Sequence, residues 1–136
     1  MIERRLKTFC RQKTIQNHRQ SEVDMSVDAV KKYLRKWDKQ DDVLEFDTSS
    51  ATVELAAQAL GVEPERIAKT ISLQYEDSAI LIVTAGDAKI DNKKFKAQFE
   101  TKAKMLVPED VLKFVGHAVG GVCPFAVADP TVKTYT

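Results

Sequence analysis

Two apolar and β-branched runs, separated by three polar residues, most constrain the fold of this 136-residue chain. The runs span residues 69–75 and 79–84, and the polar residues between them are Glu76, Asp77 and Ser78. Runs of this length around a short polar segment are typical of a β-hairpin. The chain therefore needs a sheet with at least one antiparallel pair of strands.

Helix signals and further strand signals alternate along the chain. Residues able to cap a helix precede three apolar-periodic segments: Ser26, Thr52 and Asp91. Pro64 and Pro108 suit the first turns of two further helices, and Gly61 and Gly116 suit helix ends. Short strands are expected at 43–46, 104–107 and 132–135. Strands interleaved with helices predict a mixed α/β (α+β) domain.

Composition excludes several classes of protein. Hydrophobic and charged residues make up 43% and 30% of the chain, which is ordinary for a globular domain. The net charge of +1 gives no overall basic field for nucleic acid, so a polyanion would have to meet a local patch. Cys10 and Cys123 are far apart, and no Cys/His cluster has metal-ligand spacing. No apolar run reaches the length of a membrane span, and no signal peptide is apparent, so a cytoplasmic location is expected.

Residues 1–24 differ in character from the rest. They contain six basic residues against three acidic ones and few apolar side chains. A disordered basic extension is the preferred interpretation, with a tRNA-contacting arm or a transit peptide as alternatives. The folded domain is then expected to span residues 25–136.

The segment Gly116–Phe125 contains three glycines and Pro124 and carries very little charge. Glycine lets main-chain N–H groups approach a ligand closely, so Gly120 and Gly121 are candidates to stabilise a developing oxyanion. The alternative is a tight loop whose glycines only satisfy positive φ.

Four motifs together resemble the YbaK/prolyl-tRNA editing family of aminoacyl-tRNA deacylases, the stand-alone relatives of the editing domain of bacterial prolyl-tRNA synthetase. The motifs lie at residues 49–52 (SSAT), 66–70 (RIAKT), 86–91 (GDAKID) and 116–125 (GHAVGGVCPF). The resemblance implies a mixed sheet with a barrel-like shape. It also implies hydrolysis of an amino acid wrongly esterified to tRNA, most plausibly alanine or cysteine on the proline tRNA, without metal or organic cofactor. Misacylated tRNA is then the expected partner, together with prolyl-tRNA synthetase.

The resemblance also suggests site residues. Lys69 is expected to act in catalysis with Gly120 and Gly121. The substrate-binding set is expected to comprise Ser50, Thr52, Thr70, Gly116, His117 and Pro124. Family members continue beyond the position of Thr136 through a helix and a strand, so a shortened domain that binds tRNA or a synthetase without hydrolysis is the alternative function.

Two further interpretations concern the pair Cys123 and His117 and a lysine-rich stretch. Cys123 and His117 permit a thiol-dependent hydrolase, although a small buried cysteine is the commoner role. Lys89, Lys93 and Lys94 belong to the lysine-rich stretch 89–104 and are candidates to contact tRNA phosphates. A solvated helix face is the alternative for that stretch.

Overall fold

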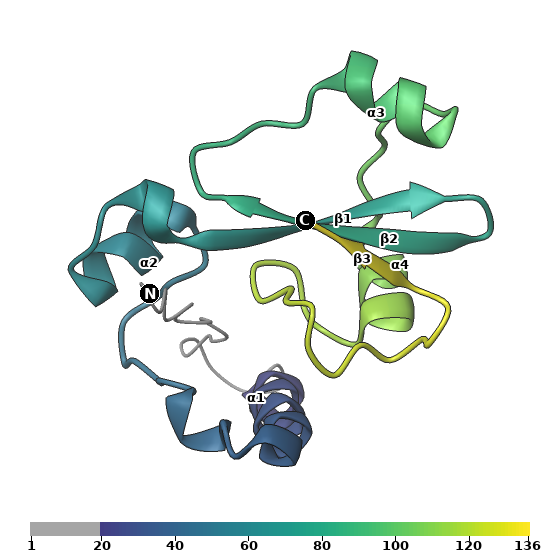
Figure 1. Cartoon of the computed structure of the whole chain (residues 1–136). Helices are drawn as coiled ribbons and strands as arrows, with labels where there is room; N and C mark the ends of the chain where they lie inside the picture. Colours follow the sequence, from purple (N-terminus) through teal and green to yellow (C-terminus); the bar gives the residue numbers. More distant parts are fainter. Residues whose placement is uncertain (1–19) are drawn as a thin grey trace.

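A hairpin of two eight-residue strands forms the centre of the structure (Figure 1). The computed structural model describes residues 20–136, so residues 1–19 of the predicted extension lie outside the described residues. Strand β1 (Ala68–Tyr75) pairs antiparallel with β2 (Ser78–Ala85), and the short strand β3 (Lys133–Tyr135) lies parallel to β2 on its other side. The predicted hairpin and last strand are confirmed.

Apart from one short contact, the sheet is open along the edge of β1 that faces away from β2. Its strand order is β1-β2-β3, so the described residues form no closed barrel, and the barrel-like shape expected from the resemblance is not seen. The predicted strand at 104–107 contributes only a single antiparallel bridge, Met105 opposite Leu73. The predicted strand at 43–46 is wrong. Val43 is instead buried against the first helix.

The two faces of the hairpin are covered by different elements. On one face Leu73 and Ile80 pack against Phe95 of helix α3 (Asn92–Phe99). On the other face Leu81 packs against residues of the π-helical segment η4 (Val111–Val115), which continues helix α4 (Pro108–Asp110). Figure 1 shows α3 and α4 on opposite sides of the strands. Because strand side chains alternate, odd-numbered residues of β1 face α3 and even-numbered residues face the opposite side.

The helix caps predicted in the middle of the chain are confirmed. Thr52 caps helix α2 (Val53–Leu60), and Gly61 ends it in the left-handed conformation. A single 3-10 turn, η3 (Pro64–Arg66), then leads into β1. Asp91 caps α3 by accepting from the main-chain N–H groups of its first turn. Pro108 opens the α4–η4 segment, which ends at Gly116 as predicted.

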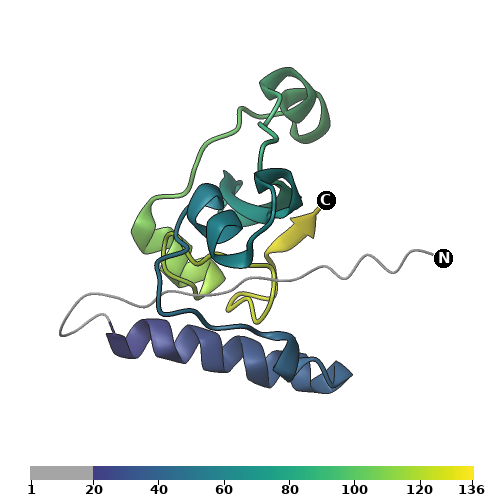
Figure 2. The ribbon, with the colours of Figure 1, turned by 90° about the vertical axis from the view of Figure 1, so that its left-hand side faces the viewer.

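The first helix, α1 (Gln20–Leu34), begins six residues before the predicted cap, and Ser26 lies inside it. Ser26 is therefore not an N-cap. Val27, Val30 and Leu34 are buried and pack with Val43 and Cys123, so the apolar periodicity was read correctly. Two 3-10 turns follow, η1 (Arg35–Trp37) and η2 (Gln40–Asp42). Figure 2 shows α1 running along one side of the molecule, across from α3.

Candidate active site

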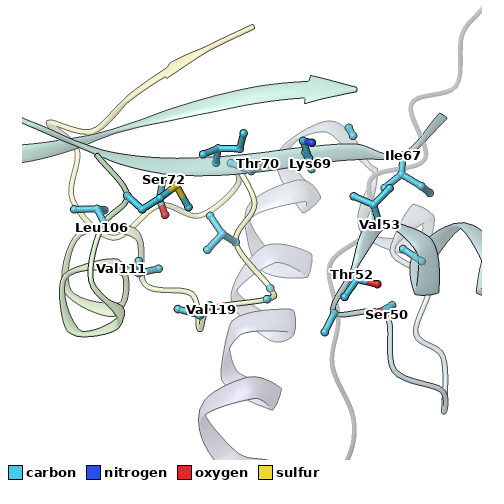
Figure 3. A pocket seen from close by; sticks show the side chains of 18 residues that line it. Ser50, Thr52, Val53, Ile67, Lys69, Thr70, Ser72, Leu106, Val111 and Val119 are labelled. Carbon is cyan, nitrogen blue, oxygen red and sulfur yellow. The ribbon is translucent and has the colours of Figure 1, made fainter. Parts of the chain in front are cut away.

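A cavity of about 240 Å³ lies where the N-terminus of α2, strand β1 and the glycine-rich loop meet (Figure 3). We call residues 116–125 the glycine loop. The cavity wall is made by residues 50–53 and 67–72, by Met105 and Leu106, and by residues 119–122, with Ala56 and Val111. Segments far apart in the sequence thus converge on one hollow, which combines apolar walls with a few polar groups.

Six of the predicted site residues line this cavity: Ser50, Thr52, Lys69, Thr70, Gly120 and Gly121. Ser50 is buried at the entry to α2. The Oγ1 atom of Thr52 accepts from the main-chain N–H of Leu55 at 3.2 Å. A hydroxyl that accepts a capping bond still has its own hydrogen to donate, so capping and ligand contact are compatible for Thr52.

The turn 118–121 brings the main chain of the glycine loop to the cavity. Gly121 donates its main-chain N–H to the carbonyl of Ala118 at 3.0 Å, which closes the turn. Gly120 has a φ of +90°, as the third residue of a type II turn requires. The Gly121 amide is therefore committed to the turn. The Gly120 amide donates to no main-chain acceptor within residues 20–136.

The Lys69 side chain has a main-chain hydrogen-bond partner. Its ammonium donates to the main-chain carbonyl of Gly86 at 2.8 Å. Figure 3 shows the Lys69 nitrogen and Val119 on opposite sides of β1, in agreement with the alternation that sets Lys69 on the same face as Ile71. The structure thus brings the main chain of Lys69 to the cavity but does not bring its ammonium to the glycine turn.

Gly86 itself is tightly enclosed beside the cavity. A Cβ atom at this position would lie 2.3 Å from the Pro64 carbonyl oxygen and 2.5 Å from Cγ1 of Val53, so only glycine fits. Val53 is part of the cavity wall. The Lys69–Gly86 bond therefore connects β1 to the packing that holds the α2 side of the cavity.

The sequence did not identify Ser72, whose side chain is buried and lines the cavity. Figure 3 shows its hydroxyl on the same side of β1 as Leu106. Its position two residues after Thr70 places both side chains on one strand face, and this spacing was the available signal. Met105 and Val119 also line the cavity, although they are 62% and 59% exposed, which puts apolar side chains at its mouth.

Three predicted substrate-binding residues do not line the cavity: Gly116, His117 and Pro124. Gly116 ends η4 with a φ of +79° and lies against Ala128. His117 is only 1% exposed, and its Nε2 atom lies 2.7 Å from the carbonyl oxygen of Phe125. Burial lowers the pKa of His117, and the hydrogen bond to Phe125 opposes part of that shift. Gly116 and His117 thus lie at the base of the glycine loop.

Cys123 lies beside this imidazole and away from the cavity. Its Sγ atom is 3.5 Å from Nε2 of His117 and 3.7 Å from the Phe125 carbonyl oxygen, and the residue is 3% exposed. A nucleophilic thiol has to reach its substrate, so this placement disfavours the hypothesis of a thiol-dependent hydrolase. The residue packs with α1 instead.

The three candidate tRNA-contacting lysines lie on the far side of the sheet. Lys93 and Lys94 are in the first turn of α3 and Lys89 is in the segment before it, and all three are exposed. Within residues 20–136 no group of three or more His, Cys, Asp or Glu side chains is placed to hold a metal ion. None of the helices in that range is long and apolar enough to span a membrane.

Comparison with known proteins identifies the family. Residues 47–136, which include the whole cavity wall, match the family described as the aminoacyl-tRNA editing domain. The chain belongs to this family. The uncharacterized protein YwhH of Bacillus subtilis is 54% identical over 110 residues, which cover 79% of this chain and 70% of YwhH.

Two further proteins to which the chain is similar carry names that mention proline or prolyl tRNA synthetase. The proline–tRNA ligase of Thermotoga maritima is 30% identical over 77 residues, which are 56% of this chain and 13% of the ligase. A solved structure described as a candidate trans-editing enzyme for prolyl tRNA synthetase superposes with a TM-score of 0.70 at 28% identity. The match covers 79% of this chain and 69% of that one, and it confirms the predicted family and the mixed α/β fold.

Proposed function

We propose that this editing domain hydrolyses the ester bond of a misacylated tRNA, with alanine or cysteine on the proline tRNA as its substrate. The observation that carries the proposal is the cavity itself. In a chain of the editing family, it joins hydroxyl groups at the α2 N-terminus, the edge of β1 and the main chain of the glycine turn. Its volume of about 240 Å³ suits a small aminoacyl group better than a large one.

The proposed reaction needs no group outside the substrate, water and the cavity wall. The oxygen of water attacks the ester carbonyl carbon, and the carbonyl oxygen gains negative charge in the tetrahedral intermediate. The main-chain N–H of Gly120 donates to that oxygen, and one such donor typically contributes about a hundredfold or more in rate. The bond to the ribose oxygen then breaks and that oxygen takes up a proton, which releases the free amino acid and the tRNA. The neighbouring ribose 2′-OH helps to activate the water, so the protein need not supply a strong base.

Lys69 acts in this proposal as a positioning residue. Its ammonium donates to the Gly86 carbonyl, and Gly86 packs against Val53 and Pro64. The hydrogen bond thereby keeps the α2 side of the cavity at a fixed distance from β1. Loss of the ammonium leaves a carbonyl without its partner and loosens that wall.

The lysines at α3 are proposed to bind phosphates of the acceptor stem. Because α3 and the cavity lie on opposite faces of β1, a tRNA whose aminoacyl end enters the cavity would have to pass the hairpin to reach Lys89, Lys93 and Lys94. This arrangement suits contacts between the lysines and phosphates of the base-paired stem, rather than contacts to the single-stranded end of the tRNA.

The proposal is tested with proline tRNA charged separately with alanine, cysteine and proline. Each is incubated with the protein, and release of the amino acid is followed against spontaneous hydrolysis in buffer. We expect accelerated release of alanine or cysteine and little release of proline. Binding of the charged tRNA without acceleration of any release would contradict the proposal and favour the binding-protein alternative.

A further inference from the structure

The edge of β1 that faces away from β2 is only partly paired beside the cavity. In an antiparallel pair, alternate residues direct their main-chain N–H and C=O groups toward the partner strand and away from it. Gln74 donates to the Lys104 carbonyl and the Ser72 carbonyl accepts from Leu106, so even-numbered residues of β1 direct these groups away from β2. Thr70, two residues further along, continues the same outward row.

Segment 104–106 forms hydrogen bonds with the outward main-chain groups of β1 only at Gln74 and Ser72. The chain then turns away into α4, and neither the N–H nor the C=O of Thr70 has a recorded partner among the described residues. Six consecutive residues, 67–72, line the cavity. A strand face alone would contribute every second residue, so the main chain of β1 also contributes to the wall. Thr70 therefore presents one unused donor and one unused acceptor beside the cavity.

We infer that the main-chain N–H and C=O of Thr70 bind the aminoacyl group as a neighbouring strand residue would be bound. An aminoacyl ester carries an amine and a carbonyl on one carbon, with the spacing of a residue in a strand. The α-ammonium donates to the Thr70 carbonyl, and the ester carbonyl accepts from the Thr70 N–H, which completes a closely spaced pair of bonds. This inference rests on the proposed deacylation and names the groups that recognise its substrate.

The pairing makes the α-amine a recognition element independent of the amino-acid side chain. Hydrogen bonds to a charged group are stronger than neutral ones, so loss of the ammonium is expected to cost about tenfold to a hundredfold in kcat/KM. A substrate whose amine is one carbon further from the ester carbonyl cannot form both bonds at once. Its kcat/KM should be lowered almost as much as that of a substrate without an amine.

The first test compares three esters of the proline tRNA with the unaltered protein. Alanyl, propionyl and β-alanyl esters are hydrolysed with and without the protein, and each enzymatic rate is divided by its own spontaneous rate. That division removes the intrinsic activation of an ester by its amine. We expect the alanyl ester to be accelerated at least tenfold more than the other two. Equal acceleration of all three would overturn the inference while leaving deacylation intact.

The second test removes the Thr70 N–H. Thr70→Pro eliminates this donor at an edge position where no bond to β2 is lost, and such positions tolerate proline. Thr70→Val keeps the N–H and loses only the hydroxyl, so the difference between the two variants reports on the donor. We expect Thr70→Pro to be at least tenfold slower than Thr70→Val, and equal rates would contradict the inference. Should Thr70→Pro fail to fold, the ester comparison decides alone. Absence of any hydrolysis by the unaltered protein would contradict the proposed function itself.

Discussion

The imidazole Nε2 of His117 lies 2.7 Å from the carbonyl oxygen of Phe125, eight residues further along the chain. A carbonyl oxygen can only accept, so Nε2 carries the hydrogen in this bond. The bond closes the glycine loop at its base, on either side of the turn that presents Gly120 to the cavity. His117 therefore stabilises the base of the glycine loop and does not line the cavity.

This placement predicts an effect of pH on stability. Burial lowers the pKa of His117 below its ordinary value of 6.5, so the unfolded chain binds a proton at a higher pH than the folded chain. Stability contributed by the neutral imidazole is complete above about pH 6.5 and falls as the pH drops from there toward the folded-state pKa. Urea unfolding between pH 7.5 and 5.5 should show this slope. His117→Gln, which keeps a donor for Phe125 but does not titrate, should show a flatter profile, and identical slopes would contradict this account.

The glycine turn predicts different outcomes for two neighbouring substitutions. Gly120→Ala forces an L-residue to a φ of +90° and is expected to cost about 1–2 kcal/mol of stability. Because it also disturbs the donor of the proposed oxyanion site, deacylation should fall about a hundredfold even well below the melting temperature. Gly121→Ala has no positive φ, and its new methyl group would meet no atom closer than 3.7 Å. Its melting temperature should stay near that of the unaltered protein, and its rate should fall less. The reverse order of rates would count against Gly120.

Substitution of Lys69 tests its proposed role in positioning the wall of the cavity. Lys69→Met removes the donor to the Gly86 carbonyl and is expected to lower kcat at least tenfold with a smaller change in KM. Lys69→Arg should recover part of the loss, because a guanidinium can also donate to a carbonyl. Lys32→Met, at an exposed lysine of α1, is the matched control for loss of a positive charge. A change confined to KM would instead indicate that the Lys69 ammonium binds the substrate directly.

The lysines at α3 predict a change in salt dependence. Simultaneous change of Lys89, Lys93 and Lys94 to alanine should weaken tRNA binding and flatten the plot of log affinity against log salt. Each duplex phosphate contact contributes about 0.9 to that slope, so three lost contacts should reduce it by about 2–3. A control protein with three exposed lysines changed near the end of α1 (Lys32, Lys36 and Lys39) should keep the original slope. Equal slopes in both proteins would show that the α3 lysines are only a solvated face.

Local signals in the sequence predicted the elements that depend on near neighbours. Thr52 and Asp91 cap helices because their side chains bond main-chain N–H groups within three residues, and Gly61 needs only its own φ. The hairpin follows from two apolar runs with a short turn between them. These features depend little on distant parts of the chain.

The sequence was least informative where distant contacts decide the structure. Val43 belongs to an apolar run that resembles a strand, but it is buried against α1 and pairs with no strand within residues 20–136. Ser26 was a plausible cap, yet α1 begins at Gln20. The orientation of Lys69 depends on strand alternation and on the position of Gly86, seventeen residues away. A motif placed Lys69 and Gly120 in one site, but it gave no information on which face of β1 carries the ammonium.

The cavity beside the β1 edge and the glycine turn is proposed to be where the aminoacyl ester is broken. Release of labelled alanine from alanyl proline tRNA, measured under single-turnover conditions with the unaltered protein and with Gly120→Ala, tests this most directly. We expect release well above the buffer rate for the unaltered protein and about a hundredfold less for the variant. Release at the buffer rate by the folded, tRNA-bound protein, or equal rates for both proteins, would contradict this proposal.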